Sequence, residues 1–115
     1  MSDDKVIQIL TNVFLSEQEA DLLAKNHIDN FPLHLEVFKK NGLQRVILAK
    51  NMQDDGSHKI FTVCIFTDQA SYEKCLPMLK KYASLVEPSQ SELPQKVSSS
   101  LSQILHDTEN IQQSG

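Results

Sequence analysis

The sequence contains few glycines and few cysteines, and each shortage excludes a class of site. The three glycines, Gly42, Gly56 and Gly115, are scattered along 115 residues, which excludes a phosphate-binding P-loop and a dinucleotide fingerprint. The two cysteines, Cys64 and Cys75, are too few for a disulfide framework or for a zinc site made of cysteine alone. Because both lie among apolar neighbours, we expect buried free thiols in a reducing cytosol, and a disulfide between them is the alternative.

Long apolar runs are also missing. Val46–Ala49 and Val63–Phe66 are among the longest, whereas a membrane-spanning helix needs about 20 residues. The acidic start of the chain lacks the basic region, apolar stretch and cleavage site of a signal peptide. We therefore expect a cytoplasmic protein without membrane insertion.

The charge balance argues against a strongly basic nucleic-acid-binding protein. The net charge is −4, and it divides into −4 over residues 1–30, +2 over residues 31–87 and −2 over residues 88–115. A centre of +2 is weak for a surface that binds phosphates.

No catalytic or metal-binding motif appears. The sequence has no G-x-S-x-G elbow, and its four histidines form neither H-E-x-x-H nor an i, i+4 pair. Residues 54–56 resemble part of a calcium loop but lack its alternating ligands. A cysteine–histidine pair is conceivable, as in any domain with these residue types. We therefore predict no catalytic, cofactor-binding or metal-binding residue, and a protein that is not an enzyme.

The first part of the chain predicts two helices. Val6, Ile9, Leu10 and Val13 recur at helical spacing after Ser2, which indicates a helix over residues 3–14. The β-branched residues in this segment leave a first strand open as the alternative. Ser16 with an acid three residues later is a capping box, and it predicts a second helix over residues 17–30, before Pro32.

Three strand-like runs follow, at residues 33–38, 43–51 and 58–67. Asn41-Gly42 is typical of a two-residue hairpin turn, and residues 54–57 predict a second turn. The third run is apolar on both faces, with Ile60, Cys64 and Phe66 on one and Phe61, Val63 and Ile65 on the other. An edge strand of this kind needs a cover, so either another element pairs beside it or its second face is packed.

The end of the chain predicts two more helices. An apolar stripe from Tyr72 to Val86 follows a capping Asp68, with Pro77 inside it and Pro88 after it. Residues 88–93 have the composition of a linker, and residues 94–108 that of a marginal amphipathic helix. Together, these segments predict one compact α+β domain at residues 1–87. Its fold is a three-stranded antiparallel β-meander packed with helices, in the order α-α-β-β-β-α. Residues 88–115 are predicted to form a polar tail that contains a C-terminal amphipathic helix.

This order of elements resembles the layout of double-stranded RNA-binding domains. Residues 68–73, however, are neutral to acidic where that family carries a basic cluster. The order of the elements, the small size of the domain and its acidic charge are also similar to those of small secretion chaperones, which dimerise and hold an unfolded segment of another protein.

The leading hypothesis is therefore a non-enzymatic protein-interaction module that binds itself as a homodimer, or another protein partner, through an apolar sheet face or edge strand. The alternatives are a chaperone-like or ligand-binding domain using the cleft between sheet and helices, and a weak nucleic-acid binder. No cofactor is expected. The residues predicted to form the interaction surface are Ile47, Ile60, Cys64, Phe66, Val97, Leu101, Ile104 and Leu105.

Overall fold

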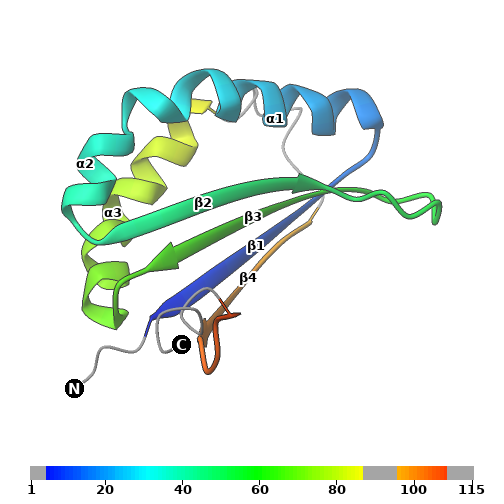
Figure 1. Ribbon diagram of the computed structural model, residues 1–115. Helices are drawn as coiled ribbons and strands as arrows, with labels where there is room; N and C mark the ends of the chain where they lie inside the picture. Colours follow the sequence, from blue (N-terminus) through cyan, green and yellow to red (C-terminus); the bar gives the residue numbers. More distant parts are fainter. Residues whose placement is uncertain (1–4, 87–95, 109–115) are drawn as a thin grey trace.

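Four strands form one antiparallel sheet, and the helices lie on one side of it (Figure 1). A computed structural model describes residues 5–86 and 96–108. The strand order in the sheet is β2-β3-β1-β4. The elements are β1 (Val6–Phe14), α1 (Glu17–Asn30), the 3₁₀ helix η1 (Phe31–Leu33), α2 (Leu35–Lys40), β2 (Leu43–Lys50), β3 (His58–Phe66), α3 (Gln69–Val86) and β4 (Lys96–Gln103).

The predicted first helix is wrong, because residues 6–14 form the central strand β1. Five of its nine residues are β-branched, and such side chains pack well on a pleated surface. The apolar residues that fit a helical stripe divide instead between the two faces of the strand. β1 pairs with β3 from Val6↔Phe66 to Phe14↔His58, so the alternative of a first strand is confirmed.

The predicted strand over residues 33–38 is also wrong, because this segment forms η1 and α2. Pro32 lies in the first turn of the 3₁₀ helix, where its missing N–H costs nothing. The turn brings the rings of Phe31 and Phe38 together in the core, with centroids 5.3 Å apart. Gly42 therefore ends a helix rather than turning a hairpin, with a φ of 104° and its N–H bonded to the Lys39 carbonyl.

The predicted helix over residues 94–108 is wrong as well. Residues 96–103 form β4, which pairs antiparallel with β1 from Val6↔Gln103 to Val13↔Lys96. Val97, Ser99 and Leu101 thus share one face at strand spacing. As a strand, this segment forms backbone hydrogen bonds with the edge of β1. As a helix, it would have only its own internal hydrogen bonds and little apolar surface to pack, so it would be marginal. With β1 and β4 the sheet has four strands, so the three-stranded meander is replaced. The predicted linker, 88–93, lies outside the described residues.

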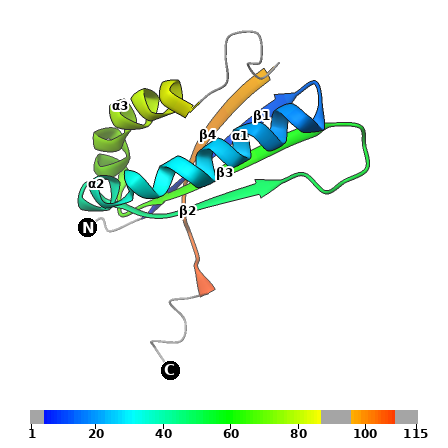
Figure 2. The same ribbon diagram turned by 90° about the horizontal axis from the view of Figure 1, so that it is seen from above.

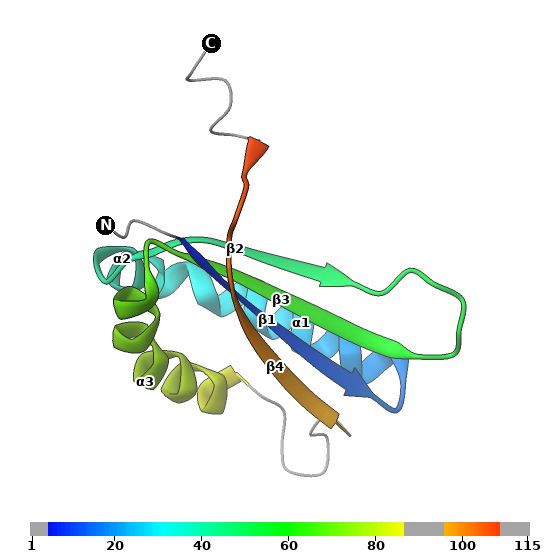
Figure 3. The same ribbon diagram turned by 90° about the horizontal axis from the view of Figure 1, so that it is seen from below.

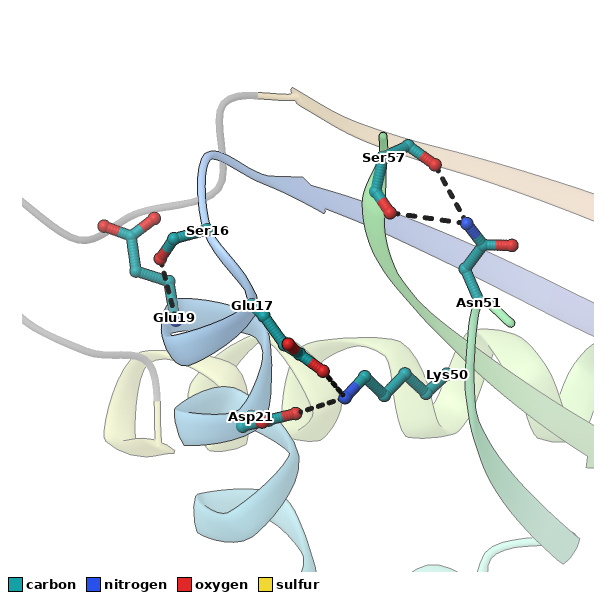
Figure 4. A network of polar contacts seen from close by, with 7 residues as sticks. All are labelled: Ser16, Glu17, Glu19, Asp21, Lys50, Asn51 and Ser57. Atoms are coloured by element: carbon teal, nitrogen blue, oxygen red, sulfur yellow. Dashed lines mark hydrogen bonds and ion pairs between the residues drawn. The ribbon is translucent and has the colours of Figure 1, made fainter. Parts of the chain in front are cut away.

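Other predicted elements are confirmed. The Ser16 hydroxyl accepts a hydrogen bond from the Glu19 N–H at 3.2 Å and begins α1 (Figure 4). The β2–β3 hairpin is present, and the amide of Asn51 donates to the Ser57 hydroxyl across its loop at 2.9 Å. Asp68 accepts a hydrogen bond from the N–H of Ser71, and α3 continues through Pro77.

An ion-pair cluster joins the helical layer to the sheet at the hairpin end. Lys50 of β2 lies 2.8 Å from the Glu17 carboxylate and 2.9 Å from that of Asp21, both on α1 (Figure 4). The two carboxylates raise the pKa of Lys50. All three side chains are exposed, so the cluster contributes little to stability and mainly orients α1 over β2.

The two faces of the sheet differ. Val6, Phe14, Ile60, Cys64 and Phe66 point toward the helices and form the buried core with residues of α1, η1, α2 and α3. α1 lies over the sheet, and α3 lies beside it toward one end (Figure 2).

Alternation places seven apolar side chains on the opposite side, where the view from below shows strands without a covering helix (Figure 3). We call this the open face. It comprises Ile7, Ile9, Val13, Ile47, Phe61, Val63 and Ile65. Within the described residues, no helix is long and apolar enough to cross a membrane.

Candidate functional site

A cavity of about 200 Å³ lies between the helical layer and the sheet. Its floor is the helix-facing side of the four strands, and its walls come from α1, η1 and α3. The lining residues are Leu10, Asn12, Leu23, His27, Phe31, Val46, Leu48, Thr62, Cys64, Leu79, Tyr82 and Val97. A concave and mostly apolar space with a few polar groups is the usual form of a small-molecule site.

The local sequence explains the lining. Leu10 and Asn12 are two residues apart on β1, as are Val46 and Leu48 on β2, so each pair shares the helix-facing side. On α1, Leu23 and His27 are four residues apart and lie on one side of the helix.

One wall of the cavity is aromatic. The imidazole of His27 stacks on Phe31, with ring centroids 5.1 Å apart and planes inclined by 7°. Tyr82 meets Phe31 edge-on at 5.2 Å and His27 edge-on at 5.7 Å. Its hydroxyl donates a hydrogen bond to the His27 carbonyl at 3.4 Å, which ties α3 to α1. The wall therefore offers flat aromatic surface held in place from two helices.

The cavity is electrically neutral near pH 7. Burial lowers the pKa of His27, which favours the neutral imidazole. Burial also raises the pKa of Tyr82 to about 12. The pKa of the Cys64 thiol is raised to about 12, mainly by burial and further by the nearby Cys75. No other lining residue is ionisable, so an occupant meets only apolar and uncharged polar groups.

Two polar side chains interrupt the apolar floor. Asn12 of β1 and Thr62 of β3 both line the cavity, and both are half-buried. In the pairing of β1 with β3, Thr62 lies opposite Leu10, so Asn12 and Thr62 are diagonal neighbours on one face. Within the part of the chain that the structure describes, neither side chain forms a hydrogen bond.

The residues predicted to form an interaction surface lie in different places. Ile60, Cys64 and Phe66 are buried under the helices, and Cys64 lines the cavity. Ile47 is on the open face. The remaining four lie on or just after β4. Val97 lines the cavity, and Leu101 is exposed on the same side of the strand. The N–H of Ile104 donates to the Lys5 carbonyl at 2.9 Å, and Leu105 is exposed beyond it, where the chain leaves the sheet (Figure 3).

Apart from Cys64 and Val97, the cavity residues were not predicted, and those of β1 were missed because the main prediction placed β1 in a helix. If residues 6–14 are taken as a strand, alternation puts Leu10 and Asn12 on the face of the buried Val6 and Phe14. His27 and Tyr82 follow the apolar stripes of their helices but carry no motif that marks a site. Across residues 5–86 and 96–108, no three His, Cys, Asp or Glu side chains group closely enough to hold a metal ion.

No family model matches the chain, and no curated protein matches its sequence. Solved structures match its fold, which is the ferredoxin-like α+β fold. A dimeric ferredoxin-like protein from an uncultured marine organism is 15% identical with a TM-score of 0.76, and the match covers 90% of this chain and 98% of that one.

Two oxygenases have the same fold. A monooxygenase from the ActVA-Orf6 gene of Streptomyces coelicolor, solved with nanaomycin D, is 8% identical with a TM-score of 0.66 and 91% coverage of both chains. SnoaB, a cofactor-independent oxygenase from Streptomyces nogalater, is 15% identical with a TM-score of 0.57, and the match covers 92% of this chain and 97% of that one. These neighbours overturn the expectation of a non-enzymatic protein, since enzymes are built on this fold.

Proposed function

We propose that the protein is a homodimer that binds an aromatic small molecule in the cavity between its helices and its sheet. The observation that carries the proposal is the lining of the cavity. Of its twelve residues, seven have aliphatic or phenyl side chains, and Cys64 and Tyr82 bring the mainly apolar ones to nine. None of the twelve is charged near pH 7. Such a lining favours ligands whose surface is mainly apolar. The stack of His27 on Phe31, with Tyr82 at its edge, favours a flat ring, because aromatic groups pair face to face with an offset or edge to face.

Binding of naphthalene tests the cavity. Val46 points into it, whereas the next residue, Ile47, points to the open face. Val46→Trp fills the cavity, and we expect it to weaken binding at least about tenfold, which corresponds to about 1.4 kcal/mol. Ile47→Trp is the matched control: because Ile47 lies outside the cavity, we expect wild-type affinity, with light scattering to show that the oligomeric state is unchanged.

Titration of naphthalene with the wild type and both variants gives the comparison, with thermal unfolding as the check on folding. The proposal is supported if naphthalene binds the wild type saturably at one site per chain and Val46→Trp weakens this binding at least about tenfold. Absence of saturable binding by the wild type, or equal affinity in the two folded variants, overturns it.

Self-association rests on the open face. Five of its seven apolar side chains lie directly opposite one another across strands: Ile7 lies opposite Ile65, and Val63 of β3 lies between Ile9 of β1 and Ile47 of β2. A contiguous apolar surface of this kind marks a protein contact site, and a two-fold homodimer is the simplest closed assembly. The dimeric state named for the similar marine protein supports this.

Oxygenation of the bound compound is the second candidate function. It is favoured by the two neighbours described as oxygenases. In the proposed reaction, dioxygen oxidises a CH₂ group of the substrate. Both carbon–hydrogen bonds of that carbon break, one oxygen atom becomes its carbonyl oxygen, and the other leaves as water with the two hydrogens. Incubation of compounds that bind the cavity under ¹⁸O₂ tests it. Products carrying one ¹⁸O support oxygenation, and absence of enzyme-dependent labelling in every bound compound rejects it.

A further inference from the structure

The cavity floor contains one polar position in an otherwise apolar surface. Asn12 and Thr62 come from adjacent strands, face the helices and lie diagonally across the β1–β3 pairing. Along the same sides of the strands, Asn12 lies between Leu10 and Phe14 and opposite Ile60, and Thr62 lies between Ile60 and Cys64. Leu48 of β2 lies opposite Thr62. The amide and the hydroxyl are thus close to each other and surrounded by apolar groups.

Both groups are available to an occupant. Among the described residues neither forms a hydrogen bond. By contrast, the amide nitrogen of Gln8, on the same side of β1, donates to Ser99 of β4 at 3.3 Å, although its Oε1 has no partner among the described residues. A polar group in an apolar cavity makes a hydrogen bond worth more than one at the surface, because water competes less well.

The chemistry of the pair selects the ligand group. An amide offers one acceptor oxygen and two donor hydrogens, and a threonine hydroxyl both donates and accepts. Together they match a phenol, which both donates and accepts a neutral hydrogen bond, or a carbonyl oxygen, which accepts one from the amide N–H or the hydroxyl. They do not match a carboxylate, because neither side chain carries a compensating positive charge and burying an unpaired charge is costly.

We propose that Asn12 and Thr62 are positioning residues that hold a phenol or carbonyl oxygen of the ring-shaped ligand against the sheet, with its ring on the His27–Phe31 wall. This inference rests on the proposed function of the cavity. It adds that the ligand is uncharged where it meets the floor, and that its oxygen points toward β1 and β3.

A comparison of naphthalene with 1-naphthol tests the pair. The two compounds have the same ring system and differ by one hydroxyl. Asn12→Leu and Thr62→Val keep side-chain size and remove the hydrogen-bonding atoms. Thr11→Val is the matched control, because Thr11 lies next to Asn12 on β1 and faces the open side. Dissociation constants of both compounds are measured for each variant, with 1-naphthoate as the charged probe.

We expect the ratio of 1-naphthol affinity to naphthalene affinity to fall about tenfold in the double variant Asn12→Leu/Thr62→Val, while naphthalene affinity stays within about threefold of the wild type. Thr11→Val leaves the ratio unchanged, and 1-naphthoate binds more weakly than 1-naphthol. An unchanged ratio in the folded double variant overturns the role of the pair while leaving the cavity proposal intact. Absence of binding by both neutral compounds to the wild type overturns the proposed function itself.

Discussion

The imidazole of His27 lies flat on the ring of Phe31, with centroids 5.1 Å apart. The contact sits at the junction of α1 and η1 and forms part of the cavity wall. Because the imidazole is half-buried there, desolvation lowers its pKa from the ordinary value of 6.5. A residue that stays neutral in the fold and is protonated in the unfolded chain makes stability depend on pH.

We predict that His27 lowers stability as the pH falls. Above about pH 6.5 it is neutral in both states and contributes nothing to the pH dependence. Below that pH the unfolded chain takes up a proton first, so stability is lost until the folded protein also binds one. His27→Phe keeps a ring in the stack, and its urea stability should fall less than the wild type between pH 7.5 and 5.5. Equal losses in the two proteins would contradict this account.

Gly42 and Gly56 provide a matched pair of substitutions. Both have positive φ, 104° and 79°. A Cβ on Gly42 would also collide with the side chain of Ser71, whereas one on Gly56 meets open space. We expect Gly42→Ala to reduce the free energy of unfolding by about 2–3 kcal/mol and Gly56→Ala by about 1 kcal/mol. Chemical denaturation measures both, and an equal cost would mean that the Ser71 contact yields freely.

Gln8 carries a buried polar atom that lacks a partner. Its Oε1 accepts no hydrogen bond from the described residues, although its Nε2 donates to Ser99. Gln8→Met keeps the length of the side chain and removes this atom. We predict a protein as stable as the wild type or more stable by about 1 kcal/mol, because an unpaired buried acceptor costs free energy. A lower melting temperature would show that the amide contributes more than it costs.

The open face predicts the oligomeric state. Val63 lies opposite Ile9 at the centre of this face. Val63→Lys places a charge in the proposed interface, so we expect it to convert a dimer into a monomer. Leu22→Lys on the exposed side of α1 is the control and stays dimeric. Size-exclusion chromatography with light scattering measures the masses, and a monomeric wild type at high concentration would reject the interface.

The elements that were predicted correctly have strong local signals. Ser16 and Glu19 form a cap that needs no tertiary contact, and the apolar run of β3 with its preceding turn indicates a strand by itself. The apolar character of both faces of β3 left two alternatives open, an element that pairs beside it or a packed second face, and the structure has the first of these. That element is β1, which lies between β3 and β4.

The elements that were missed depend on distant partners. Residues 96–103 are rich in serine and become a strand because β1, some 90 residues earlier, offers an edge. The apolar residues of segment 6–14 fit the spacing of a helix as well as that of a strand. The segment forms the strand β1 because it lies between β3 and β4 and pairs with both. The cavity is lined by residues of all four strands and three helical segments together, so no single segment predicted its lining.

Methyl NMR during a titration with 1-naphthol tests the central claim, that the helix–sheet cavity is the ligand site. Neighbouring residues on one strand report on opposite faces: Leu10 and Val46 line the cavity, while Ile9 and Ile47 lie on the open face. The account predicts saturable shifts at the Leu10, Val46 and Leu79 methyls and unchanged Ile9, Ile47 and Val63 methyls. Shifts confined to the open-face methyls, or absent from both sets, would contradict it.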